Sequence, residues 1–358
     1  MFGIDNNIIG NLKMSKAHDF DKLFSHSNVE RSVKGDTMTL YDENTGEEIK
    51  FSSITITKDE RFRSLSFGCK TVKSGPNVEY VKLDVFVSEP GGHNLVPLSK
   101  SEMMLKHDTL MIYIKEKYGL NIDNSEAKYN FIEINNTIEV DYELKEYHYV
   151  FELIHDIAPA RYKRVIKEME AKSKDLQNEI RSIVYENGSM KIKIYNKTKQ
   201  LEQELKIIIE KRCVRIEVCL KDAKKVKAVF GTNYVSEISD EMLKEYYLKV
   251  VTEDIFNRID EYIKKANKEL KKELKIEKKA EPKKYPKLYL KGVCGLKYKK
   301  TGLDLVFDIE QVLEILKNDV SRWDRTYKTL VNEVDKRPHK KNNLARYNEI
   351  KQKTLDLN

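Results

Sequence analysis

The chain has 358 residues, of which 40% are hydrophobic and 35% are charged, which is enough for a large core and predicts two folded units. Lysine and arginine number 66 against 58 acidic residues, and the net charge of +8 favours anionic partners such as nucleic acid. The four cysteines never form a C-x-x-C pair, which argues against a zinc knuckle or a disulfide framework, and the lack of a secretion signal or of an apolar run of about 18 residues predicts a cytoplasmic protein without a membrane segment.

The first part of the chain predicts a mixture of strands and helices. Residues 1–35 show no clear period and are interpreted as a flexible arm or a lead-in helix. From Asp36 onward, short alternating runs predict strands. A hairpin turn is predicted at DENTG, where Gly46 supplies a backbone conformation that other residues rarely adopt. Further strands are predicted at VEYVKLDVFVSEPGG, FIEINNTIEVDY, MKIKIY and RCVRIEVCLK, and helical stretches near SKSEMMLKHDTLMIYIKEKYG, from about Leu144 to Tyr185 and from Asp222 to about Lys275. This order predicts an α+β fold, with a central antiparallel sheet and helices on one face, as one domain over residues 36–263.

The second part of the chain is more basic. Residues 264–284 contain ten lysines and four glutamates and are interpreted as a helix extension or a linker. Residues 285–358 predict a small helical DNA-binding domain, with a winged-helix or helix-turn-helix module as one form that it can take. The basic side chains expected to contact DNA in this domain are Arg322, Arg325, Lys328, Lys340 and Lys341.

The segment GSMKIKIYNKTKQLE ends a strand on a tyrosine. Because strand side chains alternate, Lys191, Lys193 and Tyr195 share one face, whereas the apolar residues between them share the other. Ammonium groups beside a phenol bind anions and are expected to lower the pKa of Tyr195, which suits a nucleophile aimed at a phosphate. A solvated sheet face with no chemical role remains the alternative.

The same alternation places carboxylates on the polar faces of three other predicted strands. Glu133 and Glu217 lie opposite the apolar faces of their strands, Arg215 lies beside Glu217, and Asp84 has a comparable position on a third strand. If these strands are neighbours, Asp84, Glu133 and Glu217 form a site for a hard cation such as Mg²⁺ or Mn²⁺, with Tyr195 beside it. Lys191, Lys193 and Arg215 are then expected to contact DNA phosphates.

The amino-acid sequences of two segments resemble those of plasmid and phage rolling-circle replication initiators from Gram-positive mobile elements. KIKIYNKTKQLE is similar to their R-I-Y-D-K-x-x-E segment, and CVRIEVCLK is similar to the R-x-E-h-x-L strand that follows it. The resemblance covers roughly Val78 to Leu220 and extends to helical segments of the tail. It implies that Tyr195 is the nicking tyrosine, that Glu133 and Glu217 bind the metal, and that Lys197 supports a phosphate.

The family resemblance implies a nicking and closing strand transferase that forms a 5′-phosphotyrosine intermediate at a replication origin. Its expected partners are origin DNA, with a host helicase and a second copy of the chain as further candidates. The His-hydrophobic-His metal motif of many initiators is absent from the sequence, so the expected metal ligands are acidic. A conjugative relaxase with the same chemistry and a non-catalytic DNA-binding regulator remain alternatives.

Overall fold

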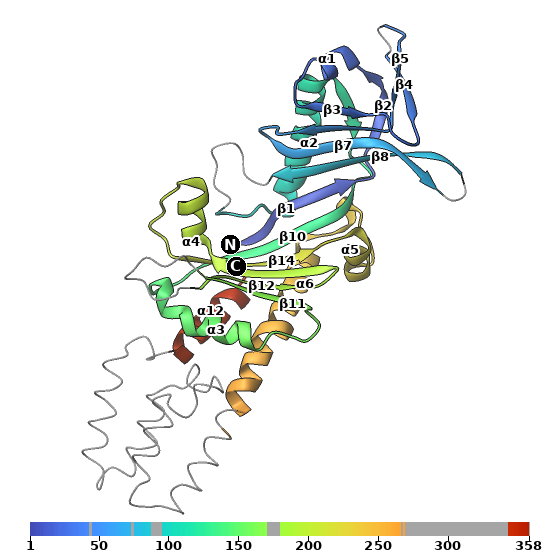
Figure 1. Ribbon diagram of the computed structural model, residues 1–358. Coiled ribbons are helices and arrows are strands. Elements are labelled where there is room, and N and C mark those ends of the chain that lie inside the picture. The colour runs from blue at the N-terminus through green and yellow to red at the C-terminus, as the bar shows by residue number, and fades with distance from the viewer. Residues whose placement is uncertain are drawn as a thin grey trace, which may run out of the picture.

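The computed structural model describes residues 1–42, 45–72, 75–86, 95–169, 180–265, 268 and 343–357. Its largest element is a ten-stranded antiparallel sheet in the order β11-β12-β13-β14-β10-β1-β8-β7-β6-β3, which runs along the molecule (Figure 1). Its strands are β1 (Phe2–Gly10), β3 (Val29–Ser32), β6 (Ser53–Thr57), β7 (Phe62–Val72), β8 (Gly75–Phe86), β10 (Lys128–Glu139), β11 (Arg164–Met169), β12 (Ile180–Glu186), β13 (Met190–Asn196) and β14 (Cys213–Leu220). Two small sheets pair β2 (Lys13–His18) with β9 (Leu120–Asp123) and β4 (Met38–Tyr41) with β5 (Glu48–Phe51).

The helices complete an α+β protein, the class that the sequence predicts. They are α1 (Phe20–Phe24), α2 (Lys100–Tyr118), η1 (Leu144–Tyr147), α3 (His148–Asp156), α4 (Lys197–Gln200), η2 (Leu201–Leu205), α5 (Ala223–Phe230), η3 (Val235–Glu237), α6 (Asp240–Val251), η4 (Thr252–Phe256) and α12 (Asn343–Leu355). Across the described part of the chain, every helix is too short or too polar to cross a bilayer.

The two faces of the sheet differ in character along each central strand. On β14, Val214, Ile216 and Val218 are buried in the main core, which also contains residues of α2, α3, α5, α6 and α12. The intervening side chains of β14 lie on the opposite face, where Cys213 packs against Leu201 at the start of η2. Most helices therefore cover one face, as expected, whereas α4 and η2 lie at the other (Figure 1).

Helix α2 begins and ends at strong local signals. Ser99 caps it through a capping box with Glu102, because each side chain bonds the other residue's backbone amide. Gly119 ends it with φ of +70°, and a Cβ at this position would lie 2.7 Å from the carbonyl oxygen of Asp19. The predicted helix is confirmed, and its end depends on glycine for both conformation and space.

The N-terminal residues are the first departure from the sequence prediction. Instead of an arm or lead-in helix, β1 lies in the middle of the main sheet between β8 and β10. The register of β1 against β10 shifts between Ile4 and Asn6 and again between Ile8 and Ile9. These bulges break the period of two, and for this reason alternation does not reveal the strand.

The passage from Leu144 to Tyr185 is the second departure, because among its described residues only the start is helical. Helix α3 ends at Asp156, and the chain then forms the antiparallel pair β11 and β12. Val165, which faces Tyr185 across this pair, packs against the core. The predicted hairpin at Gly46 is confirmed by the β4 and β5 pair, with φ of +71° at the glycine.

The end of the chain returns to the body of the protein. In α12, Tyr347 and Ile350 are buried in the main core, as is Leu357 just beyond it. The Tyr347 hydroxyl donates to the carbonyl of Phe256 at 3.1 Å and to Asp260 at 2.8 Å. Residues 343–357 are therefore packed against the sheet domain.

The remaining predictions for the C-terminal region fall on residues that the structure does not describe. These are the lysine-rich segment beyond residue 268, the helices expected between residues 285 and 342, and the side chains of Arg322, Arg325, Lys328, Lys340 and Lys341. Their roles stay predictions.

Candidate functional site

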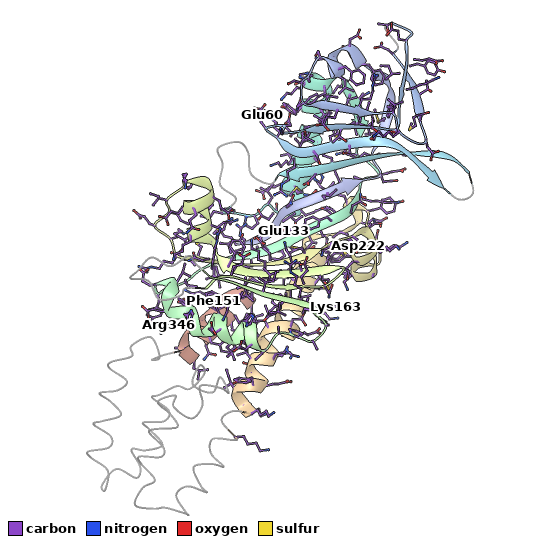
Figure 2. All side chains as sticks on the ribbon, in the orientation of Figure 1. Glu60, Glu133, Phe151, Lys163, Asp222 and Arg346 are labelled. Carbon is purple, nitrogen blue, oxygen red and sulfur yellow. The ribbon has the colours of Figure 1, made fainter. Side chains whose placement is uncertain are left out.

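Three carboxylates from three adjacent strands meet on the polar face of the sheet. Asp5 of β1, Glu133 of β10 and Glu217 of β14 each place an oxygen within 4.8 Å of the others. Strand β10 lies between β1 and β14, and the bulge of β1 falls at Asp5, opposite Glu133. Figure 2 shows Glu133 on the strands near the middle of the molecule.

Asp5 and Glu217 are buried, Glu133 is half-buried, and the three carboxylates repel one another. Burial and the nearby Glu217 and Asp5 raise the pKa of Glu133, and burial together with Asp5 raises the pKa of Glu217. Carboxylate oxygens are the ligand type that Mg²⁺ and Mn²⁺ prefer, and a bound cation would relieve the repulsion between the three groups. The residues present thus fit a hard divalent cation.

Arg215 contacts the acidic cluster through Asp5. Its guanidinium is fully buried and donates to Asp5 Oδ2 at 2.7 Å, to Thr137 Oγ1 at 2.7 Å and to the carbonyl of Leu95 at 2.9 Å. This placement differs from the DNA contact expected from the sequence, because the side chain has no exposed surface to offer a phosphate. Its position instead orients Asp5 and partly offsets the negative charge.

Tyr195 lies beside the carboxylates, as the sequence predicts. Its hydroxyl donates a hydrogen bond of 2.6 Å to Glu217 Oε1, and Lys193 Nζ lies 4.5 Å from the centre of its ring. The pKa of Tyr195 is nevertheless raised strongly, by burial first and then by the charge of Glu217. The lowering of the Tyr195 pKa expected from the lysines is therefore wrong for this state of the site. The Glu217 carboxylate accepts the hydrogen bond of the hydroxyl, and its negative charge disfavours the phenolate.

The three lysines of this face differ in exposure. Lys191 and Lys193 are partly exposed, whereas Lys197 is fully buried and donates to Gln200 Oε1 at 2.9 Å. Burial and the charge of Arg215 lower the pKa of Lys197 to about 8. Burial lowers the pKa of Lys191, but the charges of Cys219, Glu133, Glu217 and Glu186 outweigh burial and raise it. Lys191 and Lys193 are thus the cations of this face that a ligand in solvent can reach.

Asp84 lies on the same sheet but outside the cluster. Strand β1 separates β8 from β10, and Asp84 faces Ile8 of β1 rather than either glutamate. Burial raises the pKa of Asp84, and its Oδ1 has no hydrogen-bond partner among the described residues. The structure thus brings Asp5, rather than Asp84, next to Glu133 and Glu217.

Two residues of the site were missed by sequence reasoning. Asp5 belongs to the polar stretch Asp5–Asn6–Asn7, which lies between apolar residues. Polar residues in the middle of an otherwise apolar segment are the signal that could have marked this position as a candidate site residue. Asn135, two residues after Glu133 on the same face, is fully buried, and both polar atoms of its side chain lack a partner within the described part of the chain. A buried amide of this kind is not visible to alternation alone.

Two histidines of α3 lie beside carboxylates of their own helix rather than in the acidic cluster. His155 Nδ1 lies 2.9 Å from the carboxylate of its neighbour Asp156, and His148 lies 3.9 Å from Glu152 on the next turn of α3. His93 is outside the described residues.

Comparison with known proteins adds little to this geometry. The sequence matches no family model and no curated protein. A rolling-circle replication initiator protein from Geobacillus stearothermophilus has a TM-score of 0.34 and 10% sequence identity, with 71% of this chain and 84% of that chain covered. The di-domain ARO/CYC BexL from the BE-7585A biosynthetic pathway has a TM-score of 0.20 and 11% identity, with 70% and 96% covered. Scores this low establish neither a shared fold nor a shared activity.

Proposed function

We propose that this protein is a metal-dependent DNA strand transferase that nicks an origin through Tyr195 and so starts rolling-circle replication. The observation that carries the proposal is the 2.6 Å hydrogen bond from the Tyr195 hydroxyl to Glu217, one of three carboxylates that can hold a metal. A nucleophile, a proton acceptor and a cation site on one sheet face are the parts that phosphoryl transfer requires.

The proposed step exchanges one phosphodiester for another. The Tyr195 oxygen attacks the scissile phosphorus while its proton passes to Glu217 along the existing hydrogen bond. The bond from phosphorus to the 3′ oxygen breaks, the 3′ oxygen leaves and takes a proton from water, and the 5′ phosphate stays on the tyrosine. A divalent cation at the carboxylates would neutralise the charge that develops on the phosphate. Because the ester is conserved, the reverse reaction can close the nick.

The neighbouring cations have separate roles in this proposal. Lys191 and Lys193 are partly exposed and are proposed to bind the phosphates that flank the scissile one. Lys197 Nζ lies 5.8 Å from the Tyr195 ring centre and its side chain is fully buried, so it is proposed to support the reacting phosphate through its charge rather than by direct contact. Arg215 is a positioning residue, because it bonds Asp5 and does not reach the surface.

Covalent capture tests the proposal directly. The full-length protein is mixed with a pool of labelled single-stranded DNA that includes the sequences flanking its own coding region, with Mn²⁺, and the products are separated in denaturant. We expect a DNA adduct that survives denaturant, that requires Mn²⁺, and that is absent from Tyr195→Phe. An adduct formed equally well by Tyr195→Phe would overturn the assignment of the nucleophile.

A non-catalytic DNA-binding regulator is the second candidate, and the burial of Tyr195 favours it. The side chain is only 4% exposed, and its raised pKa suits a structural phenol. Both candidates predict salt-sensitive DNA binding, since each uses cations on phosphates. Only strand transfer predicts the covalent adduct, so the capture experiment decides between them. A relaxase would give the same adduct and differs in its biological setting.

A further inference from the structure

Asn135 is an unusual residue for the interior of a sheet domain. Its side chain is fully buried, and within the described residues neither Nδ2 nor Oδ1 has a hydrogen-bond partner. Buried amides are almost always paired, because an unpaired one loses its bonds to water and gains none in return. An unpaired amide in this position therefore requires a reason.

The register of the sheet places Asn135 among the carboxylates. It faces Glu217 directly across β10 and β14, a pairing that brings Cβ atoms to about 4.5–5.5 Å. Glu133 precedes it on the same face of β10, and Gly3 is its partner on β1. Thr137, the next residue on this face, accepts a bond from Arg215, so only the amide in the middle of the row is left unpaired.

The strand register explains why Oδ1 lacks a donor. The side chains beside Asn135 on this face are Glu133, two residues before it, and Glu217, across the strand pair, and carboxylate oxygens accept hydrogen bonds and cannot satisfy another acceptor. Arg215, the buried donor of this face, bonds Asp5, Thr137 and Leu95. A cation binds amide and carboxylate oxygens at once, and would satisfy Oδ1 together with its neighbours.

We propose that Asn135 Oδ1 is a fourth ligand of a hard divalent cation held by Asp5, Glu133 and Glu217. This inference rests on the metal site of the proposed function. An amide adds a ligand without adding charge to carboxylates that already repel one another, whereas a fourth carboxylate would increase the repulsion. Four protein oxygens leave open positions on a six-coordinate ion for water or phosphate oxygens.

The test uses Mn²⁺ titration followed by electron paramagnetic resonance, on the full-length protein at one pH and without DNA. Asn135→Leu keeps the branched shape of the side chain but removes both polar atoms. We expect it to weaken Mn²⁺ binding by a factor of about 10 or more while its melting temperature in chelator stays equal to or above that of the wild type, because an unpaired buried amide is lost.

Two further variants separate ligation from shape. Asn135→Asp keeps an oxygen at this position, and we expect its Mn²⁺ affinity to lie between those of the wild type and Asn135→Leu. The matched control is Asn136→Ala, one residue away on the opposite face, where the amide donates to the carbonyl of Thr354 at 3.3 Å. We expect this control to lower the melting temperature and to leave Mn²⁺ affinity unchanged.

The outcomes distinguish this inference from the proposed function. Wild-type Mn²⁺ affinity in Asn135→Leu would overturn the ligand role of Asn135 alone. Equal affinities of the aspartate and leucine variants would also overturn it. A wild-type protein that binds no Mn²⁺ would overturn the inference and the metal-dependent function together, whereas one that binds Mn²⁺ through Asn135 but forms no DNA adduct would leave the inference standing and remove the strand transfer.

Discussion

Two clusters of acidic, tyrosine and basic side chains in this protein behave in opposite ways. The first surrounds Asp59, whose side chain is fully buried. It accepts bonds from the hydroxyls of Tyr118 at 2.6 Å and Tyr113 at 3.1 Å, from Lys117 at 2.9 Å and from the amide of Arg61 at 2.7 Å. Burial alone would raise the pKa of Asp59, but these donors outweigh it and lower the pKa.

The second cluster, formed by Asp5, Glu133 and Glu217, has more charge and fewer donors. Tyr195 donates to Glu217 and Arg215 donates to Asp5, yet burial and mutual repulsion raise the pKa values of both glutamates. The comparison teaches how to tell the two roles apart. A structural carboxylate accepts hydrogen bonds from enough donors of the protein to offset its burial. The carboxylates of a binding site have too few donors and cations around them, and a bound cation supplies the missing positive charge.

Replacing one tyrosine in each cluster should give the largest contrast. Tyr195→Phe is expected to reduce formation of the DNA adduct by more than about 10³-fold, because the attacking oxygen is lost, and to leave DNA affinity nearly unchanged. Tyr118→Phe should leave the adduct intact and lower the free energy of unfolding by about 2 kcal/mol, because Asp59 loses a buried donor. Adduct assays and urea unfolding on both variants measure these effects. Equal losses of nicking in the two variants would contradict the assignment of Tyr195 as the nucleophile.

Neutralising one carboxylate in each cluster should change stability in opposite directions. In chelator, Asp59→Asn is expected to lower the free energy of unfolding by about 3 kcal/mol, since Lys117 and the two phenols lose their common acceptor. Glu133→Gln is expected to raise it by about 1 kcal/mol, because a repelled buried charge is removed. Urea unfolding monitored by circular dichroism measures both, and a loss of stability in Glu133→Gln similar to that in Asp59→Asn would show that the site cluster is structural.

Metal addition should stabilise only the second cluster. A free Mn²⁺ concentration 100 times the dissociation constant is expected to add about 2.7 kcal/mol to the stability of the wild type, because the folded state alone has the site. Glu217→Gln should lose most of this gain, whereas Asp59→Asn should keep it. Thermal melting with and without Mn²⁺ provides the measurement. Equal gains in the two variants would place the metal elsewhere.

Strict alternation explains which parts of the site could be predicted from the sequence. Strands β10, β13 and β14 keep a period of two, so the side chains of Glu133, Tyr195 and Glu217 could be assigned to polar faces, and the structure brings these three faces together. Alternation does not give the order of strands in a sheet. Asp84 was therefore predicted as a neighbour, although β1 lies between it and Glu133.

The features that were missed depend on contacts distant in sequence. Asp5 sits in a bulge, where local period disappears, and its partner Arg215 is 210 residues away. The strands β11 and β12 were read as helix because their region begins with a real one, α3. Helix α12 was predicted as a helix, but its burial against η4 follows from tertiary packing of Tyr347, which no local pattern encodes.

The last expected contrast is a difference in pH dependence between the clusters. The ordinary pKa of Glu133 is 4.5 and folding raises it, so above pH 4.5 the folded state holds a proton that the unfolded state has lost. Stability in chelator should then fall as pH rises, by up to about 1.4 kcal/mol per pH unit. For Asp59 the pKa is lowered from 3.8, so its contribution is present above that value and is lost only as pH falls below it.

Urea midpoints between pH 5 and 8 in chelator, compared between each variant and the wild type, isolate these slopes. Buried His107, whose pKa is lowered to about 4, makes stability rise with pH up to about 6.5, but it is present in every protein compared and cancels in the difference. The gain in stability of Glu133→Gln over the wild type should therefore grow with pH across this range, because only the wild type must take up a proton at this position when it folds. The loss in Asp59→Asn should stay constant, because its carboxylate is ionised in both states throughout. A gain in Glu133→Gln that does not change with pH would mean that folding does not raise the pKa of Glu133. The cluster of Asp5, Glu133 and Glu217 would then be a structural cluster, as the one around Asp59 is.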